Sequence, residues 1–381
     1  MTQQRSSSQP PAVLGASLIS ACGSLPAQIL PLIIVFYLSQ GVLSLTQIGW
    51  LSGVMLLGQT VGSLTYPVYS DGVLGRRETL GLILASFCAL TLAPWTGFAG
   101  NLMCWFVVGF CASGMQYIGL VSATRAPDPS AALSLRLSVA LSFSGVMLIA
   151  SASLPEAPAW LVLTSVAVFQ ALVVLGAMPL ARLRRMARRG GQFAGFTGVR
   201  LGIAIWIIPC FGMFISLLSF LPVSLQGQGR SGHDVLLMMG LARLAAAPIL
   251  FVLQGRGSLL PERVVFAGFA VLTVVLFAGV VRPGFWLPVL CLVGFEAFSN
   301  VLSARFLGEI SRRHAPSETR WLSSYIQLGA GTAHVVTGYV LASQLQDAYF
   351  AVLVVVFLPL IWSVTAGRHA PREGSANQAD P

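Results

Sequence analysis

The chain has 381 residues, of which 56% are hydrophobic and only 9% are charged. Soluble domains carry about 25% charged residues, so this composition excludes a water-soluble enzyme. It also excludes a disordered chain, because disorder requires low hydrophobicity and high charge. The net charge is +10, and all 22 basic residues are arginines that lie mostly between long apolar runs. This distribution indicates membrane topology rather than a nucleic-acid-binding stripe.

The apolar runs are continuous, which favours membrane-spanning helices over a transmembrane β-barrel of alternating strands. A helix needs about 20 apolar residues to cross a bilayer. The chain therefore predicts an all-α polytopic membrane protein with twelve transmembrane helices. In chain order they are 12–38, 46–70, 78–98, 101–123, 131–153, 159–180, 200–222, 235–254, 263–281, 285–308, 321–343 and 348–366.

The arginines predict the orientation of these spans. With the N-terminus in the cytoplasm, 17 of the 22 arginines lie in cytoplasmic segments, two in outer segments and three inside spans. Because cytoplasmic loops carry the excess of basic residues, both termini are expected in the cytoplasm and the protein in the cell inner (plasma) membrane.

The longest internal loop divides the spans into two six-helix pseudo-repeats. The expected organisation is a cytoplasmic tail (1–11), an N-terminal six-helix bundle (12–180), a basic cytoplasmic linker (181–199), a C-terminal six-helix bundle (200–366) and a second cytoplasmic tail (367–381). Such internal repeats are typical of secondary transporters.

Two stretches around the second span carry a family resemblance. Residues 46–51 read Thr-Gln-Ile-Gly-Trp-Leu, and residues 71–77 read Asp-Gly-Val-Leu-Gly-Arg-Arg. Together with the twelve-span organisation, they resemble the major facilitator superfamily, in which this span begins with T-x-x-G-x-L and ends in a G-x-x-x-D-R-x-G-R-R loop. The resemblance implies that Asp71, Arg76 and Arg77 form a gating loop that clamps a neighbouring helix.

The chain departs from the family pattern at several points. Pro67 stands where the first loop glycine is expected, and Gly72 replaces the basic residue after Asp71. Trp105 occupies the place of an arginine found in many proton-coupled members, and the fifth span lacks a Gly-Pro kink. These departures argue against a standard drug antiporter. They keep open an alternative, a transporter-like protein that has lost transport and acts as a sensor or assembly factor.

Ionisable residues inside spans are the main functional candidates, since each costs at least about 2.5–3.5 kcal/mol at the bilayer centre. Glu296 lies in the middle of the tenth span, with Asn300 one helical turn further on. Its carboxylate is a candidate proton carrier, or else part of a structural ion pair. Arg243, central in the eighth span, is a candidate anion-binding group, or else a permanent partner of Glu296 or of backbone carbonyls.

His334 lies in the eleventh span on one helical face with Gln327, Gly331 and Gly338. It is a candidate proton relay, or else a hydrogen-bonded structural group. Arg136 lies close enough to the cytoplasmic end of the fifth span to snorkel. Spans 3, 6, 9 and 12 have no charged residue in their interiors, so these four are expected to be the outer, lipid-facing helices.

Neutral polar residues on other spans are expected to line the same cavity, although interhelical hydrogen bonds use the same residue types. The candidates are Gln28, Gln116, Tyr117, Ser216 and, beside His334, Gln327.

The chain has no phosphate-binding loop, no hydrolase motif, and six cysteines without a C-x-x-C pair. We therefore expect no enzymatic activity, no catalytic residue, no metal and no cofactor. The predicted function is secondary active transport of a small organic solute by alternating access, coupled to protons. The expected partners are the small-molecule substrate, protons and the lipid bilayer, with no nucleic acid and a monomeric state. Import and export stay open, with metabolite or chelator efflux favoured over drug efflux, and the arginines favour an anionic or polar solute.

Overall fold

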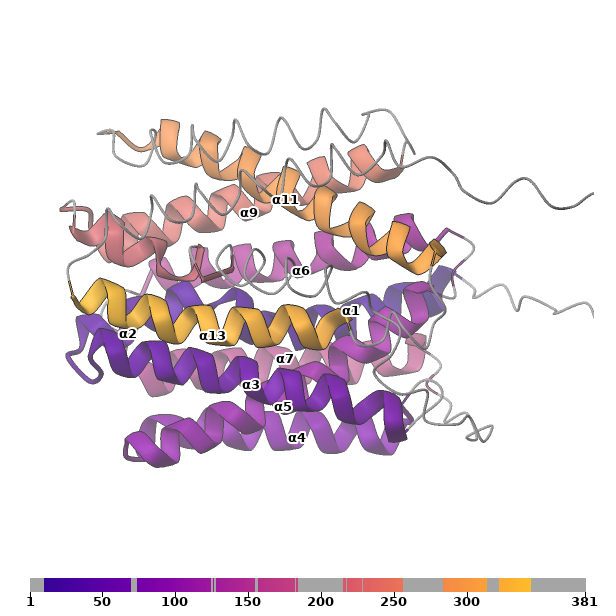
Figure 1. Ribbon diagram of the computed structural model, residues 1–381, viewed down its shortest axis with the longest axis horizontal. Helices are drawn as coiled ribbons and strands as arrows, with labels where there is room; N and C mark the ends of the chain where they lie inside the picture. Colours follow the sequence, from indigo (N-terminus) through magenta and orange to yellow (C-terminus); the bar gives the residue numbers. More distant parts are fainter. Residues whose placement is uncertain are drawn as a thin grey trace, which may run out of the picture.

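The computed structural model describes residues 10–69, 74–124, 126, 128–154, 157–181, 183, 215–216, 218–227, 229–255, 284–313 and 322–343. All regular elements in these ranges are helices (Figure 1). They are α1 (Pro10–Gln28), α2 (Leu30–Ser39), α3 (Leu45–Tyr69), α4 (Arg76–Leu92), the 3-10 turn η1 (Ala93–Trp95), α5 (Phe98–Thr124), α6 (Pro129–Ala152), α7 (Ala159–Ala181), α9 (Gly232–Gly255), α11 (Trp286–Arg313) and α13 (Leu322–Ala342). Residues 218–227 are also helical.

Six described segments are long and apolar enough to cross a membrane, which agrees with a multi-pass membrane protein. The described helices overlap the predicted spans throughout the first half of the chain. The predicted spans 263–281 and 348–366 lie outside the described residues, as do most of 200–222, nearly all of the linker 181–199, and both terminal tails except residues 10 and 11. The total of twelve spans therefore stays a prediction.

The first predicted span is one apolar segment broken into two helices. Pro26 lies in the last turn of α1 and Pro31 in the first turn of α2, with Ile29 between the two helices. Proline has no backbone N–H, so Pro31 cannot donate to the carbonyl four residues earlier, and the helical ladder is interrupted there. Ile29 still donates to the carbonyl of Leu25 and accepts from the amide of Ile33. The break falls near the middle of the segment that runs from Pro11 to Ser39.

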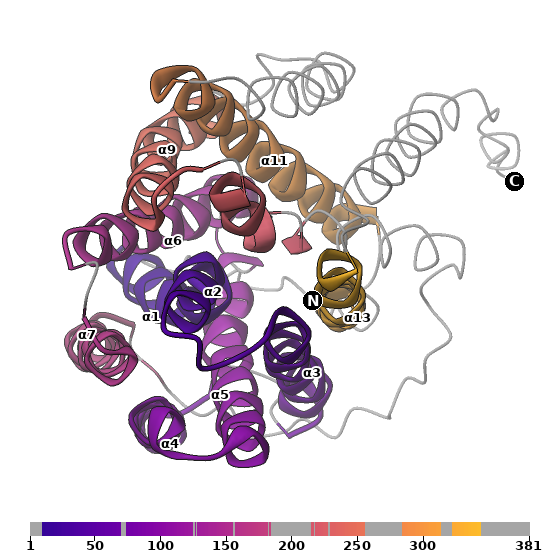
Figure 2. The ribbon, with the colours of Figure 1, turned by 90° about the vertical axis from the view of Figure 1, so that its left-hand side faces the viewer.

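This broken span lies at the centre of the bundle (Figure 2). Within its most apolar window 78% of the residues are buried, against 33% in α4 and 44% in α7. The expectation that spans 3 and 6 are peripheral is therefore confirmed, because α4 and α7 are those spans. Spans 9 and 12 lie outside the described residues.

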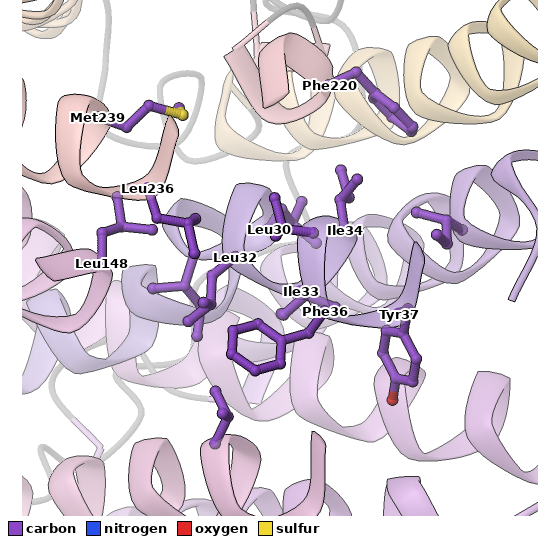
Figure 3. Packing of buried hydrophobic residues seen from close by; sticks show 14 of the residues in the cluster. Leu30, Leu32, Ile33, Ile34, Phe36, Tyr37, Leu148, Phe220, Leu236 and Met239 are labelled. Atoms are coloured by element: carbon purple, nitrogen blue, oxygen red, sulfur yellow. The ribbon is translucent and has the colours of Figure 1, made fainter. Parts of the chain in front are cut away.

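Apolar side chains of α2 fill the interior (Figure 3). Leu30, Ile34 and Phe36 are at most 4% exposed, and they belong to one cluster with Leu236 of α9 and Phe220 of the helical residues 218–227. The cluster draws on helices from distant parts of the sequence. We refer below to residues up to 181 as the N-terminal half of the chain and to residues from 215 as the C-terminal half.

Two helix pairs join these halves through glycine contacts, α3 with α13 and α6 with α9 (Figure 2). A Cβ added at Gly338 of α13 would lie 2.9 Å from Cα of Gly49. A Cβ added at Gly145 of α6 would lie 3.0 Å from the carbonyl oxygen of Gly240. Small residues let helix backbones approach closely, and this packing stabilises helix pairs in a membrane.

Within the N-terminal half, Gly109 of α5 packs directly against the backbone of α3. A Cβ at this position would lie 2.8 Å from the carbonyl carbon of Met55 and 3.1 Å from the amide nitrogen of Gln59. Both are backbone atoms of a helix, so the neighbour cannot yield by a rotamer change. Gly81 of α4 has nothing within 4 Å of its added Cβ.

We predict that Gly109→Ala lowers the free energy of unfolding by about 1–3 kcal/mol, the usual cost of overpacking. Gly81→Ala is the matched control, and there the better helix propensity of alanine should leave stability unchanged or raised by up to about 1 kcal/mol. Thermal unfolding of the two purified variants in detergent measures both effects. Equal melting temperatures would contradict the close α3–α5 contact.

Candidate functional site

An ion pair is buried between α9 and α11. Nε of Arg243 donates to Oε1 of Glu296 across 3.0 Å, and the two side chains are 5% and 7% exposed. Asn300, one turn along α11, donates through Nδ2 to the carbonyl oxygen of Glu296 (2.7 Å) and to its Oε2 (3.3 Å). Both carboxylate oxygens of Glu296 therefore have a hydrogen-bond donor, as a buried carboxylate requires.

Arg243 also reaches across to the N-terminal half of the chain. Its Nη1 donates to the backbone carbonyl of Gln28, the last residue of α1. The carbonyls in the last turn of a helix have no partner within that helix. The break between α1 and α2 therefore supplies the acceptor, and the guanidinium contacts three helices, α1, α9 and α11.

Two structural alternatives were expected for Arg243, a pair with Glu296 and a bond to backbone carbonyls, and both are present. The arginine pairs with Glu296 and with a backbone carbonyl at the same time. Gln28 was expected to contribute through its side chain, but its main chain makes the contact. The side-chain Oε1 of Gln28 is buried without a hydrogen-bond partner among the described residues.

His334 is fully buried on α13. Its Nδ1 lies 2.7 Å from the carbonyl oxygen of Ala330, and its ring packs against Phe220 with ring centroids 5.8 Å apart. A carbonyl can only accept, so Nδ1 carries the proton and Nε2 of the neutral ring is an acceptor. This Nε2 has no partner within the described part of the chain.

Two of the expected cavity-lining residues hydrogen-bond to other helices. Gln116 of α5 donates to the carbonyl of Gly23 in α1 across 3.0 Å. The hydroxyls of Ser216 and Thr337 are 2.6 Å apart. Tyr117 is half-buried beside an apolar cluster, and Gln327 is half-buried on α13. A substrate contact by any of them stays a prediction.

Arg136 makes a contact that the sequence did not predict, and its snorkelling stays a prediction. Its Nε donates to the hydroxyl of Ser20 on α1 across 2.6 Å, and that hydroxyl lies 3.3 Å from the carbonyl oxygen of Gln116. The arginine therefore connects α6 to α1 and, through Ser20, to α5. Sequence reasoning had not singled out Ser20, because a serine in an apolar helix usually bonds to its own backbone.

The predicted gating loop is only partly described. Asp71 lies outside the described residues, whereas Arg76 and Arg77 begin α4 and are exposed. Glu78 follows them in the same first turn. A clamp between this loop and a neighbouring helix therefore stays a prediction. A group of three potential metal ligands is not found in the described ranges.

The apolar helices, the broken central span and the buried ion pair describe a helical bundle with the features of a multi-pass membrane protein. No family model matches the chain, and no curated protein matches it. Among solved structures it is similar to a mutant of the nucleoside transporter NupG, with a TM-score of 0.70 and 13% identity over 93% of this chain and 98% of that one. At this identity the likeness shows the fold alone, and it supports the major facilitator type of fold expected from the sequence.

The ion pair leads to a double-mutant prediction. Arg243→Met should lower stability by about 3–5 kcal/mol, because it leaves Glu296 as a buried charge without its partner. The double variant Arg243→Met/Glu296→Met should recover most of that loss, since neither charge then remains. Thermal unfolding of the single and double variants measures the coupling. A double variant that loses as much stability as the single variants together would contradict a direct pair.

Proposed function

We propose that the chain is a secondary active transporter that moves a small organic solute across the inner membrane by alternating access, coupled to protons. The likeness to a nucleoside transporter over nearly the whole chain supports the transporter class. The coupling rests on the contacts of Arg243, which link the pair with Glu296 to the carbonyl of Gln28.

Glu296 is the proposed proton site. Removing one charge of a buried pair costs about 3–5 kcal/mol because the other charge loses its compensation. Protonation of Glu296 removes its negative charge, and Arg243 then needs other acceptors. The arrangement with Arg243 held between Glu296 and Gln28 is therefore favoured only while Glu296 is ionised. Proton uptake therefore shifts the conformational equilibrium away from this arrangement, toward one in which Arg243 bonds to other acceptors.

The same contact is placed to affect the relative position of the two halves of the chain. Gln28 belongs to the N-terminal half, whereas Arg243 and Glu296 belong to the C-terminal half. A change at Glu296 alters a bond that joins them, which is the requirement for linking protonation to a rocking motion. The glycine contacts between α3 and α13 and between α6 and α9 form two interfaces, which we call seams. In this proposal the halves move along these two seams.

The excess of arginines in alternate loops supports an orientation with both termini in the cytoplasm. Two solutes are suited to a first transport assay. Uridine is the first solute to test, because the structural neighbour is named as a nucleoside transporter. Benzoate is the anionic comparison, because the arginines inside the spans favoured an anionic or polar solute.

We predict that Glu296→Gln abolishes accumulation driven by a pH gradient but preserves solute exchange. The amide has the shape of the carboxyl group but carries no titratable proton, so binding is kept and coupling is lost. Proteoliposomes with radiolabelled uridine or benzoate, with and without the gradient, measure both activities. Accumulation should fall at least tenfold, whereas Asp234→Asn, the corresponding change of a carboxylate to an amide at the exposed start of α9, should leave it unchanged.

Wild-type accumulation by Glu296→Gln would remove this carboxylate from the mechanism. A wild-type protein that moves neither solute, with or without the gradient, would favour the alternative of a transport-inactive sensor or assembly factor. The direction of transport is read from the same assay by reversing the gradient.

A further inference from the structure

Gln59 of α3 has a side chain that the protein itself leaves unsatisfied. It is 1% exposed, and neither Nε2 nor Oε1 has a hydrogen-bond partner in the described structure. Buried polar groups in native proteins are nearly always paired, so a buried amide with both ends unpaired requires an explanation.

Gln59 points toward the interior of the bundle. Trp50, Leu57 and Val61 are the exposed positions of α3 around it, at 42%, 44% and 37%. At about 100° per residue, Gln59 lies on the opposite side of the helix from these three. It therefore faces away from the lipid, between the helix faces that contact α5 and α13.

On α13, Gln327 and His334 also face the interior. Leu328, Val336 and Tyr339 are exposed at 42%, 51% and 49%, so they mark the lipid-facing side of α13. The same helical geometry places Gln327 and His334 roughly 100–180° away from those positions. Like Gln59, His334 has a buried atom without a partner in the described ranges, its acceptor Nε2.

The contacts between α3 and α13 place these residues at defined levels. A Cβ at Gly53 would lie 3.1 Å from the carbonyl oxygen of Gly331, and the hydroxyls of Ser63 and Ser324 are 2.6 Å apart. The two helices are therefore antiparallel, and Gln59 is level with Gln327. His334 is level with Gly53, about 10 Å further along the helix.

We propose that Gln59, Gln327 and His334 form a binding subsite for an uncharged, amide-bearing solute at the seam between α3 and α13. A glutamine amide presents one donor and one acceptor side by side, and its complement is a carboxamide, lactam or ureide edge. Nε2 of His334 accepts a second N–H or O–H of the solute. The proposal rests on the transport function and specifies its substrate class.

The charges of the interior agree with a neutral solute. While Glu296 is ionised, Arg243 is compensated by Glu296 and by the carbonyl of Gln28, so it does not need an anion from the substrate. This weakens the preference for an anion that the count of arginines suggested. The subsite also takes residues from both halves of the chain, so a bound solute contacts the two parts that are proposed to move.

The first test needs no ligand. Gln59→Leu removes an unpaired buried amide, so the melting temperature of the full-length protein in detergent should stay the same or rise. The matched control is Gln170→Leu, because Gln170 is equally buried and its Nε2 donates to the carbonyl of Cys22 across 2.8 Å. That variant should melt at a lower temperature. A loss in Gln59→Leu as large as in Gln170→Leu would overturn the proposal.

The second test measures binding through the thermal shift of the wild-type protein. Uridine and nicotinamide carry a lactam or a carboxamide, 3-methyluridine lacks the lactam N–H, and benzoate is an anion. Uridine, nicotinamide or both should stabilise the protein, whereas benzoate should not. If uridine binds, 3-methyluridine should bind at least tenfold more weakly. Gln59→Leu and Gln327→Leu should each weaken the binding of a neutral probe at least tenfold.

The proposal is overturned if neither amide probe stabilises the protein, if benzoate stabilises it equally, or if Gln59→Leu binds like the wild type. These failures are separable from failure of the transport function. Proton-driven transport that survives Gln59→Leu intact refutes the subsite alone. Full accumulation by Glu296→Gln, combined with lost binding in Gln59→Leu, refutes the proton site and leaves the subsite standing.

Discussion

The hydrogen bond from Arg243 to the carbonyl of Gln28 connects two features that are each unfavourable alone. A guanidinium in the apolar interior of a bundle is costly unless its charge and its donors are satisfied. A broken helix in the same environment leaves carbonyls without donors. Here the break between Pro26 and Pro31 provides an acceptor, the arginine provides a donor, and Glu296 provides the balancing charge. The irregular first span and the buried ion pair therefore depend on each other.

The contacts between the two halves of the chain differ in kind from place to place. At the seams, Gly49 meets Gly338 and Gly145 meets Gly240, so the helices touch through backbone and small side chains. Such contacts have no charge to break and tolerate small displacements. The bond to Gln28 is a charge-assisted hydrogen bond and is geometrically strict. The halves also share neutral hydrogen bonds, such as the one between Ser63 and Ser324. The bond to Gln28 differs from these because its donor carries a charge that the proposed proton site balances.

Much of the fold could be predicted from the sequence because long apolar runs in a charge-poor chain have few structural solutions. The central positions of Arg243 and Glu296 also marked them as candidates, and their pairing was one of the expected alternatives. The acceptor on Gln28 could not be predicted, because every residue has a backbone carbonyl and only the three-dimensional break frees this one. The partner of Arg136 could not be predicted for a similar reason, since Ser20 lies on a helix more than a hundred residues away. Gln59 was missed because a single glutamine carries no signal until burial and the lack of a partner are known.

The two proposed centres divide the chemistry of transport between a charged site and a neutral one. While Glu296 is ionised, the Arg243–Glu296 pair is compensated internally, so the solute is not required to balance its charge. The amides of Gln59 and Gln327 can then select for hydrogen-bonding pattern rather than for charge. If the solute is uncharged, each proton moved carries one net charge across the membrane. The membrane potential then contributes about 2.3 kcal/mol per 100 mV to the driving force. An anionic solute moving together with a proton would cancel that contribution, so the neutrality of the solute site determines how the cycle uses the energy of the membrane.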